Sequence, residues 1–294
     1  MGYLLAFMSA FCYSVTNIVL KKGMRHSEEN GVWIITFINA VFLGLIFILS
    51  LILQTSSPSI NLHGIVLFTT AGILINFVGR TLLYSGIRKI GASKAVAIKN
   101  SAPVFTLLFA VFIIKEQISL GPWVGIILII VGMFLLGLHL FKEDTAISAG
   151  AGYWVALYAA AAYGIGQGLS KQGINSLDNP FFGVFIGAVA AFLILSLIEA
   201  YRGNLKNQLG RVLDGRSNHY IAAGVLTSLA LLFFYLSISY IHVSYTVAIL
   251  AADPVFTVIL SNFFLKKEES ITKLLITVAV LVFIGAGIIS VMGG

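Results

Sequence analysis

The sequence predicts an all-α polytopic membrane protein, and its composition and apolar runs support that prediction. Of the 294 residues, 59% are hydrophobic and only 10% are charged, whereas soluble globular proteins carry about 25% charged residues. The mean hydropathy is +1.01. Apolar runs long enough to cross a bilayer as helices, about 20 residues each, follow one another along the chain. This composition disfavours a soluble enzyme, a nucleic-acid-binding domain and a disordered protein.

Ten apolar runs can be delimited, and each predicts a transmembrane helix. They cover residues 2–20, 32–53, 64–87, 92–114, 120–141, 153–170, 180–200, 218–240, 243–265 and 271–292. Ten spans of about 21 residues leave only short loops and no room for a soluble catalytic domain. We expect the first run to be a retained helix, because neither a basic segment before it nor a cleavage site after it marks a signal peptide.

The basic residues predict the orientation of the chain in the cell membrane. With Lys273, at the start of the last run, counted in the loop before it, thirteen of the 18 Lys and Arg residues lie in the loops that follow odd-numbered runs, and three lie within runs. The loops after even-numbered runs hold only Lys115 and Lys171. The positive-inside rule therefore predicts cytoplasmic odd-numbered loops and extracytoplasmic termini. The basic residues lie in short loops between apolar runs and do not form one basic binding face, so we expect no nucleic-acid partner.

The two halves of the sequence resemble each other. Residues 84–115 align without gaps on residues 235–266, and the segment Pro-Val-Phe-Thr at 103–106 recurs at 254–257. Near the start of each half, Lys21 aligns with Lys171 at an offset of 150 residues. The loop 54–63 has no Lys or Arg, whereas its counterpart, the loop 201–219, has four. Five spans in each half predict two inverted repeats, at 1–143 and 151–292, an architecture that permits alternating access.

These repeats resemble the drug/metabolite transporter superfamily, in its ten-helix branch built from two EamA repeats. The resemblance rests on segments 95–103 and 246–254, and on the charged turns Lys115-Glu116 and Lys267-Glu268. It covers nearly the whole chain and implies a transporter. It also implies a central cavity lined by the first, third and fourth helices of each repeat. Relatives of this kind carry amino acids, sugars, nucleotides and drugs, so the resemblance leaves the substrate open.

Three ionisable side chains lie deep inside predicted spans: Arg80, Lys99 and Asp253. Lys94 is nearer a helix start, where its side chain can reach the interface. Each of the three deep side chains costs about 2.5–3.5 kcal/mol at the bilayer centre, so each needs a partner or a wet cavity. One interpretation is a structural ion pair between Asp253 and one of the two cations; the other is a substrate or proton site. The net charge of about +1 favours a ligand with a carboxylate or phosphate, which arginine binds in bidentate fashion.

The candidate site extends to polar neighbours of these charges. The predicted substrate-binding residues are Arg80, Lys99, Asn100, Asn76, Tyr84, Tyr13, Asn17, Tyr163, Gln167 and Tyr235. Asp253 is the predicted coupling or ion-pair residue. Pro103 and Pro254 are predicted hinges, because each proline removes a backbone hydrogen bond from its helix. The mirrored pairs Tyr13/Asn17 and Tyr163/Gln167 fit substrate contacts and interhelical hydrogen bonds equally well.

Two smaller features concern packing. Glycines four residues apart, at 121/125 and 183/187, are typical of closely packed membrane helices. The single cysteine, Cys12, lies in an apolar run and is expected to be a packed thiol.

The function predicted from these patterns is secondary-active transport by alternating access. The substrate would be a small metabolite: an amino acid, another anionic or zwitterionic solute, or a drug-like compound. The sequence lacks a Walker motif, which favours coupling to a proton or solute gradient, and we expect no cofactor and no metal. A lipid or lipid-linked carrier of the same fold is one alternative. An intramembrane enzyme is another, although no nucleophile with a base is apparent. The expected partners are the small-molecule substrate and the lipid bilayer, and a homodimer is left open.

Overall fold

The computed structural model describes residues 1–24, 31–53, 61–90, 92–142, 150–213, 217–253, 255–257, 260 and 273–293. Within these ranges the ordered elements are helices, and no strand occurs. Five helical stretches are long and apolar enough to cross a membrane by length and composition. They cover Gly2–Leu20, Val32–Ile52, Leu62–Ile90, Pro180–Tyr201 and Asn218–Tyr240. The all-α membrane fold is confirmed, while the count of ten spans stays a prediction.

The first half of the chain forms helices over all five of its predicted spans. They are α1 (Gly2–Met24), α2 (Val32–Ile52), α3 (Leu62–Gly72) continuing through the π-helix η1 (Ile73–Gly79) into α4 (Arg80–Ile90), α5 (Ala92–Lys99), α6 (Ala102–Phe109) continuing into the π-helix η2 (Ala110–Ile114), and α7 (Leu120–Lys142).

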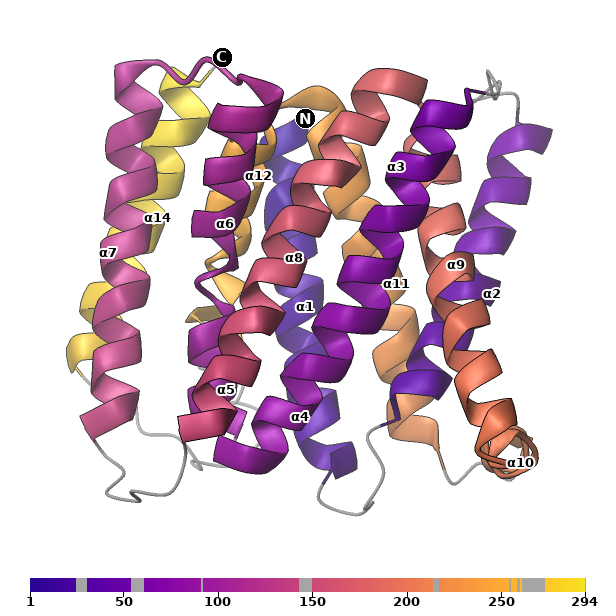
Figure 1. Ribbon diagram of the computed structural model, residues 1–294. Coiled ribbons are helices and arrows are strands. Elements are labelled where there is room, and N and C mark those ends of the chain that lie inside the picture. Colours follow the sequence, from indigo (N-terminus) through magenta and orange to yellow (C-terminus); the bar gives the residue numbers. More distant parts are fainter. Residues whose placement is uncertain are drawn as a thin grey trace.

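The second half contains α8 (Gly150–Leu177), α9 (Pro180–Tyr201), α10 (Leu205–Leu213), α11 (Asn218–Tyr240), α12 (Val243–Leu250) and α14 (Lys273–Met292). Most helices run side by side along one direction, and both termini lie at the same end of the bundle (Figure 1). The helix α1 starts at that end, whereas α8 starts at the opposite end (Figure 1). The halves therefore run in opposite senses, as expected of inverted repeats. The boundaries 1–143 and 151–292 stay a prediction.

The helices of the two halves pack in a reciprocal pattern. The first helix of each half lies against the third helix of the other, so that α1 contacts α11 while α8 contacts α3 and α4. The second helices, α2 and α9, contact each other, and so do the fifth helices, α7 and α14. Side chains from both halves therefore meet along the middle of the bundle.

Two of the helices in the first half are interrupted near the candidate residues. The π-helix η1 ends immediately before Arg80, and π-turns often occur at functional sites because they redirect side chains. The second interruption lies at Asn100 and Ser101, between α5 and α6, just before Pro103. A proline near a helix start is expected there because it has no backbone N–H to donate. The hinge function of Pro103 stays a prediction, and Pro254 lies outside the described residues.

Glycines permit two close helix crossings. At the crossing of α3 and α9, a Cβ atom added to Gly72 would lie 2.1 Å from the Cα atom of Gly187. At the crossing of α7 and α14, a Cβ atom on Gly125 would lie 2.5 Å from the carbonyl oxygen of Gly285. Both crossings join the two halves. The predicted packing function of glycines 125 and 187 is confirmed.

The short helix α10 corrects the expectation that residues 201–219 form a plain loop. Its sequence places Leu205, Leu209 and Val212 on one helical face, with Lys206 and Arg211 elsewhere on the surface. Figure 1 shows α10 nearly end-on while the other helices run upright, so it lies across the end of the bundle. An apolar face on so short a segment escapes a search for runs of about 20 residues.

The crossing of α3 and α9 makes a testable prediction for stability. Alanine at position 72 forces two backbones apart, and we expect Gly72→Ala to destabilise the protein by about 1–3 kcal/mol. The control is Gly287→Ala in α14, where an added Cβ atom meets nothing within 4 Å. That variant should be neutral or slightly stabilised, because alanine favours helix more than glycine does. Thermal unfolding in detergent measures both, and equal melting temperatures would contradict the close crossing.

Candidate functional site

Arg80 lies inside the bundle at the start of α4. Its side chain is 5% exposed. One terminal nitrogen, Nη2, donates to Oδ1 of Asn76 at 3.1 Å, and the other, Nη1, donates to Oγ1 of Thr36 at 3.3 Å. These two bonds occupy two of the five N–H groups that a guanidinium carries. The Arg80 side chain is therefore held by neutral oxygens and retains donors that can bind an anion.

Asp253 lies just beyond α12 in the second half and is 4% exposed. The side chain of Asn17 hydrogen-bonds its carboxyl group, and Lys99 acts on it through its charge. The carboxyl oxygen Oδ1 is buried without a hydrogen-bond partner in the described part of the chain. A buried polar atom left in this state costs free energy, so such an atom is expected at a site for a ligand or a proton.

Tyr13 connects these two charged groups. From α1, its hydroxyl lies within electrostatic range of Arg80 in the first half and of Asp253, Tyr163 and Tyr235 in the second. Because α1 packs beside α11 and α12, the reciprocal packing brings these side chains into one region. The structure thus places the predicted charged residues of both halves around a common tyrosine.

Lys99 and Tyr84 approach the same region through Tyr163. The Lys99 ammonium lies over the Tyr163 ring, 5.3 Å from its centroid, a distance suited to a cation–π contact. The Tyr84 hydroxyl lies within electrostatic range of Arg80 and Tyr163. These contacts place Lys99 and Tyr84 with the candidate site.

Three other predicted residues contact neighbouring helices or line a cavity. Gln167 accepts a hydrogen bond from Thr106 at 2.9 Å, and Tyr235 accepts one from Ser170 at 3.0 Å. Both bonds join helices, which fits the interhelical interpretation. Asn100 lines a mostly apolar cavity of about 210 Å3 between the α5–α6 segment, α7 and α12. The function of every site residue stays a prediction.

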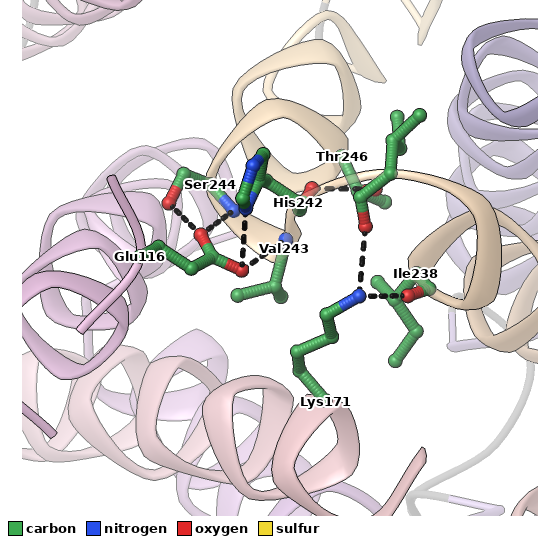
Figure 2. A network of polar contacts seen from close by, with 8 residues as sticks. Glu116, Lys171, Ile238, His242, Val243, Ser244 and Thr246 are labelled. Atoms are coloured by element: carbon green, nitrogen blue, oxygen red, sulfur yellow. Dashed lines mark hydrogen bonds and ion pairs between the residues drawn. The ribbon is translucent and has the colours of Figure 1, made fainter. Parts of the chain in front are cut away.

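A second polar cluster lies at the end of the bundle where the termini lie (Figure 2). The carboxylate of Glu116, in the turn between η2 and α7, accepts hydrogen bonds from the first turn of α12. Val243 N–H donates to Oε1 at 2.9 Å, while Ser244 donates to Oε2 through its N–H at 3.3 Å and its hydroxyl at 2.5 Å. Nδ1 of His242 lies 3.4 Å from Oε1. Glu116 therefore caps a helix of the other half.

Lys171 binds the neighbouring helix end in the same cluster. From α8, its ammonium donates to the carbonyl oxygens of Ile238 at 2.5 Å and Ile241 at 3.1 Å, at the end of α11 (Figure 2). A cation is favourable at a helix C-terminus, as an anion is at an N-terminus. The turn between α11 and α12 is thus held on one side by Lys171 and on the other by Glu116.

Burial and hydrogen bonding act against each other on the Glu116 carboxyl. Burial raises its pKa, but the hydrogen bonds from His242, Ser244 and Val243, together with the charge of His242, outweigh burial and lower the pKa below its ordinary value. The Glu116 side chain is 3% exposed, whereas that of His242 is 41% exposed. Glu116 is therefore held as a carboxylate at the edge of the bundle.

Sequence reasoning missed the functions of Glu116, Lys171 and Thr36. A signal existed for Lys171, because it is one of only two basic residues in the loops that otherwise carry none. A basic residue in a loop on the side with few charges is expected to have a specific partner, and for Lys171 the partners are the carbonyl oxygens at the end of α11. Thr36 gave no signal, since threonine is common in membrane helices and its partner lies 44 residues away in the sequence.

Comparisons with known proteins agree with this architecture. The sequence matches the EamA-like transporter family over residues 1–138 and 150–291. The chain belongs to this family. The two EamA matches fall one in each half, on either side of the segment between α7 and α8.

Individual relatives are distant. An uncharacterised transporter of Synechocystis sp. is 25% identical over 194 residues, which cover 61% of this chain and 54% of that protein. Human solute carrier family 35 member G1 is 26% identical over 213 residues, covering 67% of this chain and 56% of that protein. The aligned part thus spans about half the length of these two curated relatives. A solved crystal structure shares the fold, with a TM-score of 0.71, 14% identity and coverage of 99% and 98% of the two chains.

The lowered pKa of Glu116 predicts a pH dependence of stability. A carboxyl group with a depressed pKa stabilises the folded state above its ordinary pKa of about 4.3, and the stabilisation is lost as the pH falls through the folded pKa. We expect wild type to melt at a higher temperature than Glu116→Gln at neutral pH, and the difference to shrink on acidification. Thermal unfolding in detergent measures it, with Glu199→Gln at the other end of the bundle as control. A gap between wild type and Glu116→Gln that is independent of pH would contradict the prediction.

Proposed function

We propose that this protein is a secondary-active transporter in the cell membrane that moves a small metabolite by alternating access. The metabolite carries a carboxylate or a phosphate, and its binding site lies between the two halves. The single observation that carries the proposal is the buried guanidinium of Arg80, which is bound only by neutral oxygens in the contacts given above and lies, like Asp253 of the other half, within electrostatic range of Tyr13.

The charges define the class of substrate. Arg80 and Lys99 contribute two positive charges to a region where Asp253 contributes one negative charge. In a low-dielectric interior, the excess charge favours an anionic group, and an arginine fork binds carboxylate or phosphate in bidentate geometry. In this proposal the phenol of Tyr13 and the amide of Asn17 hydrogen-bond the rest of the solute.

Asp253 is the proposed coupling residue. Its unpartnered oxygen is able to take a proton, and a neutral Asp253 would strengthen the net positive charge that binds the anion. Proton binding and substrate binding are then linked, because each changes the charge that the other meets. Coupling to a proton gradient follows without any nucleotide.

A second candidate function, transport of a lipid or lipid-linked solute, is favoured by the cavity between α5–α6, α7 and α12. Its lining is mostly apolar, and the side chains of Val104, Phe134 and Leu138 on its rim are exposed on the outside of the bundle. An acyl chain would fit such a lining. Competition by soluble metabolites for binding would argue against this alternative.

The first experiment tests the ligand class. Purified protein is screened by thermal shift with metabolites that carry carboxylate or phosphate groups and with neutral analogues. A ligand that binds only the folded state at about 100 times its Kd stabilises it by about 2.7 kcal/mol, so the melting temperature should rise by several degrees. Arg80→Gln should lose this shift, whereas Arg202→Gln, on the exposed surface, should keep it. A shift that persists in Arg80→Gln would contradict the anion-binding function of Arg80.

The second experiment tests coupling. In liposomes, wild type should accumulate the anionic metabolite found in the screen when a proton gradient is applied. Asp253→Asn keeps the size of the side chain but cannot ionise, so we expect exchange without gradient-driven accumulation. Unchanged accumulation in this variant would remove Asp253 from the coupling mechanism.

A further inference from the structure

The cap on α12 is a direct polar contact between the two halves at one end of the bundle. Glu116 belongs to the first half, and the N–H groups and hydroxyl that it binds belong to the second. A carboxylate at the N-terminus of a helix satisfies free N–H groups and complements the helix dipole. Such charge-assisted hydrogen bonds are roughly twice as strong as neutral ones. The contact is strong, yet it consists only of bonds that can break and form again.

The capped helix leads from the membrane surface to the candidate site. Ten residues separate Val243 from Asp253, which at 1.5 Å per residue is about 15 Å, half of the hydrocarbon thickness of about 30 Å. The charged and polar side chains at the inner end, including Arg80, Asn76 and Asp253, are buried. The candidate site is therefore closed to water in this conformation, and α12 forms part of the closure.

One flank of α12 does not pack tightly. Ser244, Val247, Ala248 and Ala251 line the cavity of about 210 Å3 that lies between parts of α12, α7 and the α5–α6 segment. Tightly packed helices resist displacement because interiors have few voids. A helix beside a cavity can move into it without first displacing other side chains, so α12 has space to move once its cap is released.

The other side of the turn is held separately. Lys171 binds the carbonyl oxygens of Ile238 and Ile241 from within the second half, and Ile241 and His242 have extended backbone conformations between the two helices. Two extended residues are suited to a hinge, because rotation about ψ of Ile241 and φ of His242 leaves in place the backbone bonds of Ile241 N–H to Ser237 and of Thr246 N–H to His242. The contact of Lys171 with the carbonyl oxygen of Ile238 can thus stay in place while α12 moves.

We propose that Glu116, His242 and Ser244 form a latch that closes the candidate site at the end of the bundle where both termini lie. Release of Glu116 from α12 lets that helix swing about Ile241 and His242 into the adjacent cavity, which opens a path to Asp253. Glu116 is a positioning residue here, acting on access to the site and not on substrate directly. This inference deepens the proposed function and rests on it.

The test measures access without any substrate, so its outcome is independent of the transport assays. Ala252, which is fully buried next to Asp253, is changed to cysteine in a Cys12→Ser background, and the protein is reconstituted in liposomes. A membrane-impermeant maleimide is applied to each side in turn. Asp178 is exposed at the same end as the latch. An Asp178→Cys variant therefore gives the labelling of a fully accessible cysteine, and it shows which side of the liposome membrane that end faces.

We expect Glu116→Gln to raise the labelling rate at position 252 by about tenfold from the side of the termini, because loss of a charge-assisted contact shifts the closed–open equilibrium by about that factor. Labelling from the opposite side should not rise. Ser244→Ala removes one bond and keeps the carboxylate, so its rate should be intermediate. Glu199 lies near the C-terminal end of α9, away from the latch. The Glu199→Gln variant should therefore be labelled at the same rate as the parent protein.

Two results would overturn the latch. Unchanged labelling in both Glu116→Gln and Ser244→Ala would show that the contact is a static helix cap. An equal rise from both sides would show that the substitution loosens the whole bundle. If Glu116→Gln fails to fold, the side-specific rise in Ser244→Ala, or its absence, decides the question alone.

Discussion

Hydrocarbon offers no hydrogen bonds, and this constraint governs the whole structure. Every polar group inside the bundle has to find its partner within the protein or in a bound solute. Ser9 donates to the carbonyl oxygen of Ala230, and Ser228 bonds to Asn39, each across the boundary between the halves. The small polar residues thus join the repeats, and the charged residues that are less completely paired stand out against them.

The predicted site residues differ in how completely their polar groups are paired. Gln167 and Tyr235 are each bonded to a hydroxyl on a neighbouring helix, so they hold helices together. Asp253, by contrast, has an oxygen that the described residues leave without a partner, and Arg80 has neutral partners for its positive charge. A transporter needs such incomplete pairing, because a site already satisfied by its own protein has little to gain from a solute.

Inverted repeats give the two ends of the bundle equivalent helices, but one end can be closed while the other is open. Lys171 and Glu116 hold opposite sides of one turn in the structure described. Both act on the backbone ends of helices, where partial charges of about half a unit gather. Contacts between charged side chains and helix termini hold the two halves together near the membrane surface and can still break, because water can solvate the separated groups. Separating an apolar interface of the same size would instead expose its packed apolar area to water.

The sequence by itself determined the class of fold, the two repeats and the identity of the buried charges. Composition and periodicity carry these properties because a bilayer imposes a span length of about 20 residues on every crossing and makes each intramembrane charge costly. The short helix α10 was not predictable in this way, since its nine residues fall below that length.

The tertiary structure alone decided which polar side chains meet. Thr36 of α2 reaches Arg80 across 44 residues of sequence, and Glu116 reaches Ser244 across 128 residues. No local pattern encodes these pairs, because a threonine or a glutamate looks the same in the sequence whatever its partner. They follow from the reciprocal packing of the two halves, which sets distances that periodicity cannot supply.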